Sequence, residues 1–296
     1  MPSQTWRRAW QALALIFLPC CALAIGVTDD RGITVAFERS PQRVVSLLPS
    51  LTEAVCALDR CQRLVGVDRY SDFPAQVQRL PRLGGGIDPN IEAVVALRPD
   101  VVLLAKSSRY IDRLESLGLK VLALEPKTQA DARQVMGKLG TLLDVSDAEK
   151  IWQRIDDEVA AAARSLPPSL RGVRVYFEVN DGPYAAGEAS FIGEIMSRLG
   201  AKNIVPANLG PFPRLNPEFV VHADPDLILL GDRSESALVQ RPGWPRMRAI
   251  REKRLCTFTA AQANVLVRPG PRMGEAARLI AACIVAKGAI STERKR

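Results

Sequence analysis

The chain has 296 residues, of which 47% are hydrophobic and 24% charged, and its formal net charge at pH 7 is +8. This length and composition can bury a large core, in one large domain or two compact lobes, which excludes a disordered protein. Lysines and arginines are scattered among the acids, apart from a short basic tail at residues 294–296, so the charge does not indicate a nucleic-acid-binding protein.

Residues 1–24 have the pattern of a secretory signal peptide. Arg7 and Arg8 precede an uncharged apolar stretch at 9–18, and a small-x-small cleavage site follows at 22–24, so we expect the exported chain to begin near Ile25. The apolar stretch is too short to span a membrane. Cleavage removes two arginines and no acids, which gives the exported chain a net charge of 38 − 32 = +6. We therefore expect a protein of the periplasm.

Two cysteines in the leader leave lipidation open as an alternative. Cys20 and Cys21 lie at a suitable depth, but Pro19 and Cys20 are poor residues to precede a lipid-carrying cysteine. Of six cysteines in the chain, 6 − 2 = 4 remain after cleavage, and export places them in an oxidising compartment. Cys56 and Cys61 are the best disulfide candidates, with two free buried thiols as the alternative. The state of Cys256 and Cys283 stays open.

The first half of the exported chain alternates short apolar strands with helices. Strands are predicted at residues 43–48, 64–67, 101–104 and 120–124, and helices at 50–58, 91–97 and 111–117. Ser50 or Thr52 is expected to cap the first helix. This alternation predicts a parallel α/β sheet, and we assign residues 25–127 to an N-terminal α/β lobe.

Residues 128–168 are predicted to form a helical linker. A helix is expected at 128–143, and Ser146 and Glu149 suggest a capping box in front of a second one. Apolar residues then recur at helical spacing for about five turns, until Pro167 and Pro168 end the helix. We interpret this long helix as a rigid spacer that spans two lobes.

The α/β alternation restarts after the linker and continues to the end of the chain. Strands are predicted at 173–179, 226–230 and 255–259, and helices at 191–199 and 271–286. We assign residues 169–296 to a C-terminal α/β lobe.

An internal repeat connects the two lobes. Eight residues in the pattern NxExVVxxxPDxxLL, beginning with Asn90, recur from Asn216 onward at a constant offset of 216 − 90 = 126 positions. We interpret each copy as a helix opened near the asparagine, a Pro-Asp turn and a buried strand. Two similar lobes joined by a stiff helix would enclose a cleft, and clefts between lobes are common ligand sites.

Three segments carry a resemblance to a known family. Residues 43–53 read RVVSLLPSLTE, 64–74 read LVGVDRYSDFP, and 90–100 read NIEAVVALRPD. Together they resemble the helical-backbone solute-binding proteins of ABC importers for iron complexes, haem and cobalamin, and are most similar to the BtuF-type cobalamin-binding branch. The resemblance covers residues 32–286. It implies two Rossmann-like lobes joined by one long α-helix, with the ligand cleft between them, in a monomer that serves a permease dimer with its ATPase subunits.

The resemblance also implies roles for particular residues. Glu92 and Glu218 match one glutamate per lobe that contacts arginines of the permease, and paired carboxylates on a rigid body would orient docking. The alternative is that each is an exposed acid favoured by the dipole at its helix N-terminus.

Ligand contacts are implied at Tyr70, Tyr184, Phe212 and Arg268. Flat aromatic side chains suit a large planar ligand, although ordinary core packing is the alternative. Gly85 and Gly86, within the triple glycine at 84–86, stand where the cobalamin binders carry a tryptophan, and Ala105 stands at another such position. The glycines would allow a close backbone approach to the ligand or a tight turn. These departures leave haem and ferric siderophores as alternative ligands.

Other classes of function have less support in the sequence. A bare metal site needs several His or carboxylate ligands, and His222 is the single histidine, which we interpret as structural. The nucleophile-elbow, Walker, dinucleotide and zinc-protease motifs are absent from the sequence, which disfavours a two-lobed periplasmic enzyme. We therefore expect no catalytic residues and no catalytic cofactor, and a bound cobalamin or other corrinoid as cargo.

Overall fold

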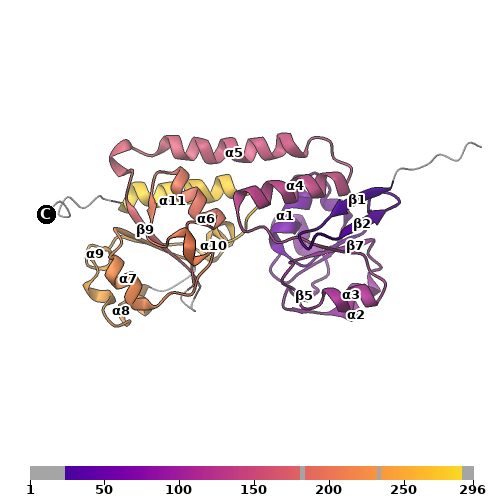
Figure 1. The fold of residues 1–296 in the computed structure, drawn as a ribbon, viewed down its shortest axis with the longest axis horizontal. Coiled ribbons are helices and arrows are strands. Elements are labelled where there is room, and N and C mark those ends of the chain that lie inside the picture. Colours follow the sequence, from indigo (N-terminus) through magenta and orange to yellow (C-terminus); the bar gives the residue numbers. More distant parts are fainter. Residues whose placement is uncertain (1–23, 181–183, 232–234, 289–296) are drawn as a thin grey trace, which may run out of the picture.

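The computed structural model describes residues 24–180, 184–231 and 235–288. The predicted signal peptide and lipidation sites lie outside the described residues, apart from Ala24. Two lobes lie side by side, and the long helix α5 (Ala148–Ser165) runs along one edge of both (Figure 1). Among the described residues, no helix combines the length and the apolar composition that crossing a bilayer requires.

The N-terminal lobe is built on a four-stranded parallel sheet in the order β4-β3-β7-β8. Its strands are β3 (Val44–Ser46), β4 (Leu64–Val67), β7 (Val101–Leu104) and β8 (Val121–Ala123), and its helices are α1 (Pro49–Ala57), α2 (Ile91–Ala96) and α3 (Ile111–Ser116). Two short antiparallel hairpins were not predicted, β1 (Ile25–Thr28) with β2 (Thr34–Phe37) and β5 (Gly84–Gly85) with β6 (Asp88–Pro89).

The C-terminal lobe repeats this plan with a five-stranded sheet. The order is β10-β9-β12-β13 with β11 also beside β9, and only β10 runs antiparallel. The strands are β9 (Arg174–Asn180), β10 (Tyr184–Ala185), β11 (Lys202–Asn203), β12 (Leu227–Leu230) and β13 (Leu255–Thr257). The helices are α6 (Phe191–Arg198), α7 (Pro217–Ala223), α8 (Glu235–Val239), α9 (Arg248–Arg251), α10 (Ala260–Leu266) and α11 (Met273–Lys287). Short 3-10 helices lie at Cys61–Arg63, Ala75–Arg79, Pro168–Leu170, Ala207–Leu209 and Trp244–Arg246.

The two predicted linker helices are confirmed, but the residues that begin them differ in part from the prediction. Helix α4 (Gln129–Leu142) begins with a complete capping box formed by Thr128 and Asp131. The capping box predicted at Ser146 and Glu149 is wrong, because Ser146 lies in a turn and α5 begins after Asp147 without a side-chain cap. The predicted cap at Ser50 or Thr52 is also wrong.

Helix α1 begins at Pro49, which has no N–H to satisfy in the first turn. This places Ser50 and Thr52 inside the helix, where the Thr52 hydroxyl turns to Ser46 at 2.8 Å. The N-terminal boundary of α1 is therefore set by a proline and not by a hydroxyl cap.

The internal repeat is confirmed in both lobes. Asn90 caps α2 and Asn216 caps α7, and in each lobe the Pro-Asp turn leads into the buried strand β7 or β12. The aspartate of the repeat makes an equivalent hydrogen bond in each lobe. Asp100 Oδ2 accepts the backbone N–H of Arg43 at 2.8 Å, and Asp226 Oδ2 accepts that of Arg174 at 3.0 Å. Each aspartate thus ties the start of its strand to the neighbouring strand.

One hydrophobic core runs from lobe to lobe through the linker helices. It includes buried residues of α1, α4, α5, α6 and α11, among them Leu51, Leu139, Val159, Ile195 and Ile280. Helices α5 and α11 lie side by side along the edge shared by the lobes (Figure 1). A continuous, closely packed core opposes independent movement of the two lobes.

Two disulfides reinforce the lobes separately. Cys56 and Cys61 form the predicted disulfide, which joins the end of α1 to the following 3-10 helix. Cys256 and Cys283 form a second disulfide, which joins β13 to α11. The sequence left this second pairing open because 27 positions separate the two cysteines.

Candidate functional site

A cavity of about 490 Å³ lies where the two lobes and the linker meet. It opens at the carboxyl ends of sheet strands, the usual position of ligands in α/β folds. Its wall from the N-terminal lobe consists of Leu48, Pro49, Ser50, Tyr70, Ala105, Ser107, Glu125, Pro126 and Lys127. Its wall from the C-terminal lobe consists of Phe191, Phe212, Asn264, Val267, Arg268 and Pro269. The predicted cleft between lobes therefore exists and has aromatic residues on both sides.

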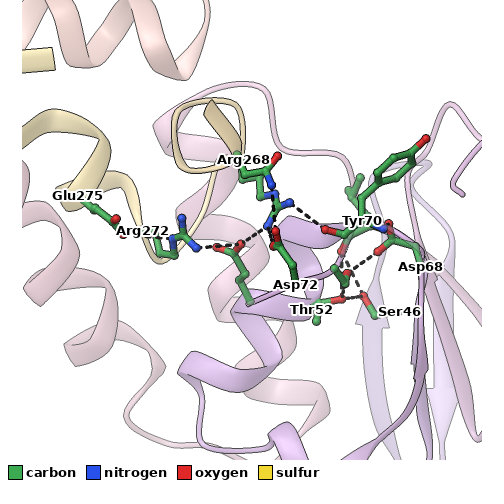
Figure 2. Close-up of polar contacts among 12 residues, drawn as sticks. Ser46, Thr52, Asp68, Tyr70, Asp72, Arg268, Arg272 and Glu275 are labelled. Atoms are coloured by element: carbon green, nitrogen blue, oxygen red, sulfur yellow. Dashed lines mark hydrogen bonds and ion pairs between the residues drawn. The ribbon is translucent and has the colours of Figure 1, made fainter. Parts of the chain in front are cut away.

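Tyr70 presents its ring to the cavity from the loop after β4. The side chain is 59% exposed, whereas its backbone is held on both sides. The Tyr70 N–H donates to Asp68 Oδ2 at 2.9 Å, and its carbonyl accepts from Arg268 Nη2 at 2.8 Å (Figure 2). An exposed ring on a fixed backbone is well placed to stack on a flat ligand.

A buried network of hydroxyl groups connects this loop to β3 and α1. Thr52 Oγ1 lies 2.8 Å from Ser46 Oγ and 2.9 Å from Ser71 Oγ, and Ser71 donates to Asp68 (Figure 2). Burial raises the pKa of Asp68, although its hydrogen bonds from Ser71 and from the Tyr70 backbone act in the opposite direction. The network fixes the path of the chain before Tyr70.

Gly85 lies beside Tyr70 and Gly86 beside Leu47, and neither glycine is among the residues that line the cavity. A Cβ atom at Gly85 would lie 2.6 Å from Asp88 Oδ1 and 3.4 Å from the Tyr70 ring, and one at Gly86 would lie 3.3 Å from the Leu47 carbonyl oxygen. The hairpin β5–β6 thus packs closely against the Tyr70 ring. This crowding explains why position 85 holds a residue without a side chain. Contact of Gly85 or Gly86 with a ligand stays a prediction.

The structure separates the two aromatic residues predicted in the C-terminal lobe. Phe212 lines the cavity and packs on Phe191, with ring centroids 6.3 Å apart. Tyr184 lies in β10, paired with Asn180, and is 40% exposed outside the cavity lining. Phe191, at the start of α6, was not predicted as a site residue, because its apolar helix gave no sign that one face meets a cleft.

Arg268 lies at the cavity wall, and three of its guanidinium N–H groups donate to the N-terminal lobe. It is 5% exposed, and Nη1 lies 2.9 Å from Glu53 Oε1 and 2.6 Å from Asp72 Oδ1 (Figure 2). Arg272 Nη1 lies 3.9 Å from the same Glu53 oxygen. We call Glu53, Asp72, Arg268 and Arg272 the interlobe cluster, because two acids of the N-terminal lobe meet two arginines of the C-terminal lobe there.

Burial and charge act against each other in the interlobe cluster. Burial raises the pKa of Glu53 in spite of the hydrogen bond from Arg268 and the charge of Arg272. Burial alone would raise the pKa of Asp72 too, but the hydrogen bond and charge of Arg268 outweigh it and lower that pKa. Burial alone would lower the pKa of Arg268, but its bonds to Asp72 and Glu53 outweigh it and raise the pKa. Sequence reasoning missed both acids.

The end of the N-terminal lobe adds a charged pair to the cavity wall. Glu125 Oε2 accepts the backbone N–H of Ser107 at 2.7 Å, and Lys127 Nζ lies 3.9 Å from Glu125 Oε1. These groups offer both acceptors and a donor to polar substituents at the edge of a ligand.

The acids predicted to dock the permease occupy equivalent places. Glu92 is the second residue of α2 and Glu218 the second residue of α7, and both side chains are exposed. Helices α2 and α7 lie on the side of their lobes away from α5 (Figure 1). The geometry leaves both carboxylates accessible to a partner, and their docking role stays a prediction.

A larger hollow of about 720 Å³ lies beside α6 and β11, away from the aromatic residues. Two of its charged groups have partners within the protein, since Glu194 accepts the backbone N–H of Gln129 at 2.6 Å and Arg198 donates to the Gln129 side chain at 2.9 Å. No group of three or more His, Cys, Asp or Glu side chains suited to a metal ion occurs within residues 24–288 as described. The cavity between the lobes remains the best candidate site.

Known proteins share this architecture. A family model described as periplasmic binding protein matches residues 44–261. A cobalamin-binding protein of Halobacterium salinarum is 31% identical over 236 residues, or 74% of this chain, although the match spans only 63% of that relative's length. A vitamin B12-binding protein of Pectobacterium atrosepticum is 27% identical over 218 residues, 69% of this chain and 76% of the relative. A solved periplasmic heme-binding protein from Pseudomonas aeruginosa is 29% identical, with a TM-score of 0.68. The match covers 85% of this chain and 96% of the heme-binding protein.

Proposed function

The chain belongs to the periplasmic binding protein family, and from this membership we propose that it is the solute-binding component of an ABC importer, which delivers cobalamin or a related corrinoid to the membrane permease. The observation that supports this proposal most is the cavity between the lobes, walled by Tyr70 on one side and Phe212 on the other. Two relatives named for binding cobalamin or vitamin B12 support the choice of ligand.

The chemistry of the cavity suits a large ring with polar edges. Tyr70 and the Phe191–Phe212 pair offer apolar faces, which bury ligand area at a low cost in side-chain entropy. Ser107, Glu125 and Lys127 lie at the cavity wall, where they can bond to polar substituents at the edge of the ring. A corrinoid combines a broad macrocycle with amide side chains that donate and accept hydrogen bonds, and so matches both parts.

Haem is the second candidate ligand, and one specific observation favours it. The Tyr70 side chain is 59% exposed at the cavity wall, and a tyrosine oxygen is a possible axial ligand of haem iron. The similar heme-binding protein from Pseudomonas aeruginosa supports this alternative. A ferric siderophore is a less specific third candidate.

The remaining expectations belong to the same proposal. The protein works in the periplasm as a monomer, after removal of a signal peptide, and Glu92 and Glu218 dock one lobe each to the permease dimer with its ATPase subunits. Residues 25–127 and 169–296 serve as the two lobes and 128–168 as the linker. The corrinoid is cargo, and no catalytic residue or catalytic cofactor is required.

Calorimetric titration of the protein that begins at Ile25 tests the ligand. The panel contains cyanocobalamin, cobinamide, haemin and small ferric siderophores. We expect a corrinoid to bind with micromolar affinity or better. Binding of haemin alone, with a Soret band typical of a bound haem, would reject the corrinoid and favour the alternative. Absence of binding by every corrinoid would remove cobalamin as the cargo.

A further inference from the structure

The side chain of Arg268 joins the two lobes at the wall of the candidate site. It comes from the connection between α10 and α11, yet its three hydrogen bonds reach the N-terminal lobe: Glu53 of α1, Asp72, and the Tyr70 carbonyl (Figure 2). The partners lie 215, 196 and 198 positions away in the sequence. One guanidinium therefore connects a helix, a loop and the backbone of the residue that faces the cavity.

The charge of Arg268 is balanced within the protein. Nη1 meets the Glu53 and Asp72 carboxylates, and Nη2 donates to the Tyr70 carbonyl. The side chain of Glu53 is only 2% exposed and that of Arg268 only 6%. Glu53 and Asp72 use both N–H groups of Nη1, so a ligand that took over Nη1 would leave the buried Glu53 carboxylate without its closest cation, which is strongly unfavourable.

We propose that Arg268 is a positioning residue, which holds the loop of residues 68–74 against the C-terminal lobe before any ligand arrives. We call this segment the Tyr70 loop. The role rests on the proposed function in solute binding, and it replaces direct ligand contact by the Arg268 guanidinium. Arg268 sets where the Tyr70 ring stands relative to Phe212 on the opposite wall.

Neighbouring contacts support the same attachment. Asn264 Nδ2 donates to Asp72 Oδ2 at 2.9 Å, and the Arg272 guanidinium stacks on the Phe73 ring, 4.3 Å from its centroid. Gly270 also lies against α1, since a Cβ atom there would be 3.6 Å from the Ser50 carbonyl oxygen. Residues 264–272 thus contact the N-terminal lobe at several points, of which Arg268 is the most buried.

The energetic consequence is a preorganised site. A ligand that meets a loop already fixed does not have to order that loop on binding, so more of the contact energy appears as affinity. Loss of Arg268 should therefore weaken binding even of a ligand that never touches its guanidinium. Direct contact predicts loss of affinity too, but it does not predict a change in the ligand-free loop.

Hydrogen–deuterium exchange without ligand, combined with calorimetric titration with cyanocobalamin and haemin, separates the two explanations. The variants are Arg268→Gln and the double variant Glu53→Gln with Arg268→Gln, which carries no unpaired buried charge and so guards against failure to fold. In both we expect the amides of residues 70–72 to exchange about tenfold faster, and affinity for the ligand bound by the wild type to fall about tenfold.

The matched control is Arg278→Gln, which removes an exposed ion pair between α11 and α5 at 2.9 Å. It should change neither measurement. Lower affinity with unchanged exchange in the Tyr70 loop would overturn the positioning role and favour direct contact, and faster exchange with unchanged affinity would overturn it as well. If the wild type binds neither ligand, the proposed cargo is rejected, while the exchange rates alone decide whether Arg268 holds the loop.

Discussion

Glu53 and Arg268 meet at 2.9 Å across the boundary between the lobes, although 215 positions separate them in the sequence. Arg268 lines the cavity and its Nη2 donates to the Tyr70 carbonyl, so this contact between the lobes lies next to the candidate site. A buried carboxylate that has lost its cation is costly, on the order of 3–5 kcal/mol. The stability of the protein should therefore depend on this pair, and the dependence should change with pH.

Arg268→Gln is expected to lower the free energy of unfolding by about 3 kcal/mol near neutral pH, and by less in acid. The lowered pKa of Asp72 stabilises the wild type above its ordinary value of 3.8, and this contribution is lost as pH falls through the folded-state pKa. The raised pKa of Glu53 acts on stability in the opposite direction. The buried charge of Glu53 destabilises the wild type near neutral pH, and this penalty is relieved as pH falls and Glu53 becomes protonated. Without Arg268 the variant has no stabilising bond to Asp72 to lose, and it has a larger penalty at Glu53 to be relieved. The difference in unfolding free energy between wild type and variant therefore decreases as pH falls.

Urea unfolding of both proteins between about pH 7 and about pH 3 measures this difference in unfolding free energy, so that the series passes below the ordinary Asp72 pKa of 3.8. Arg278→Gln is the control, because its partner Glu158 is exposed and the pair should contribute less than about 1 kcal/mol. A gap between wild type and Arg268→Gln that stays constant over this range would contradict the assignment of the effect to the two carboxylates.

Tyr70→Phe and Tyr70→Ala together should identify the type of ligand. Tyr70→Ala removes the aromatic face and should weaken any macrocycle by about tenfold, whereas Tyr70→Phe keeps the face and loses only the hydroxyl. For a corrinoid we expect Tyr70→Phe to bind within about threefold of wild type. For haem bound through iron, Tyr70→Phe should lose the tyrosinate absorption bands.

Titration calorimetry and absorption spectra record these outcomes. Tyr184→Phe is the matched control, since Tyr184 lies in β10 outside the cavity lining. Unchanged affinity of Tyr70→Ala for every ligand that the wild type binds would show that the cavity at Tyr70 is not the binding site.

Glu92→Arg combined with Glu218→Arg should abolish stimulation of the importer's ATPase while ligand affinity stays within about twofold of wild type. Both acids are exposed at the second position of α2 and α7, away from the cavity lining. Charge reversal there opposes docking to arginines of the permease. Each single reversal should weaken stimulation less than the double one.

Asp157→Arg is the control for charge reversal, because Asp157 is an exposed residue of α5, on the edge opposite α2 and α7 (Figure 1). ATPase assays with the reconstituted importer and titration of the free variants give the two measurements. A double variant that loses ligand affinity would place these acids in the binding site or in the fold.

The sequence predicted the repeated architecture because the repeat is local. The helix, the Pro-Asp turn and the strand follow one another within fifteen residues from Asn90, and hydrophobic spacing alone predicted the long α5. The interlobe cluster was not predictable in the same way. Glu53 is one acid in a short, mostly buried helix, and no periodicity shows that it faces an arginine from the other end of the chain.

The candidate site shows the same limit. The loop position of Tyr70 suggested an accessible ring, and the structure places it at the cavity wall. For Arg268 the family resemblance implied a ligand contact, and the structure adds that three of its N–H groups donate to Glu53, Asp72 and the Tyr70 carbonyl. Which partner a side chain chooses depends on tertiary packing, and a single sequence carries no record of it.

Asp100→Ala should test the strand clamp that the repeat builds in each lobe. Asp100 Oδ2 accepts the backbone N–H groups of Gln42 and Arg43 at 2.7 and 2.8 Å, next to the start of β3. Removing one acceptor that serves two donors should cost about 1–3 kcal/mol of unfolding free energy, because the two N–H groups then depend on water. Asp226→Ala should cost at least as much, since Asp226 is 4% exposed and also accepts from Arg248 at 2.9 Å. Urea unfolding at neutral pH measures both, with Asp112→Ala on the exposed face of α3 as the control. Equal stability of Asp100→Ala and the control would show that the aspartate is retained in the repeat for a reason other than holding the strands together.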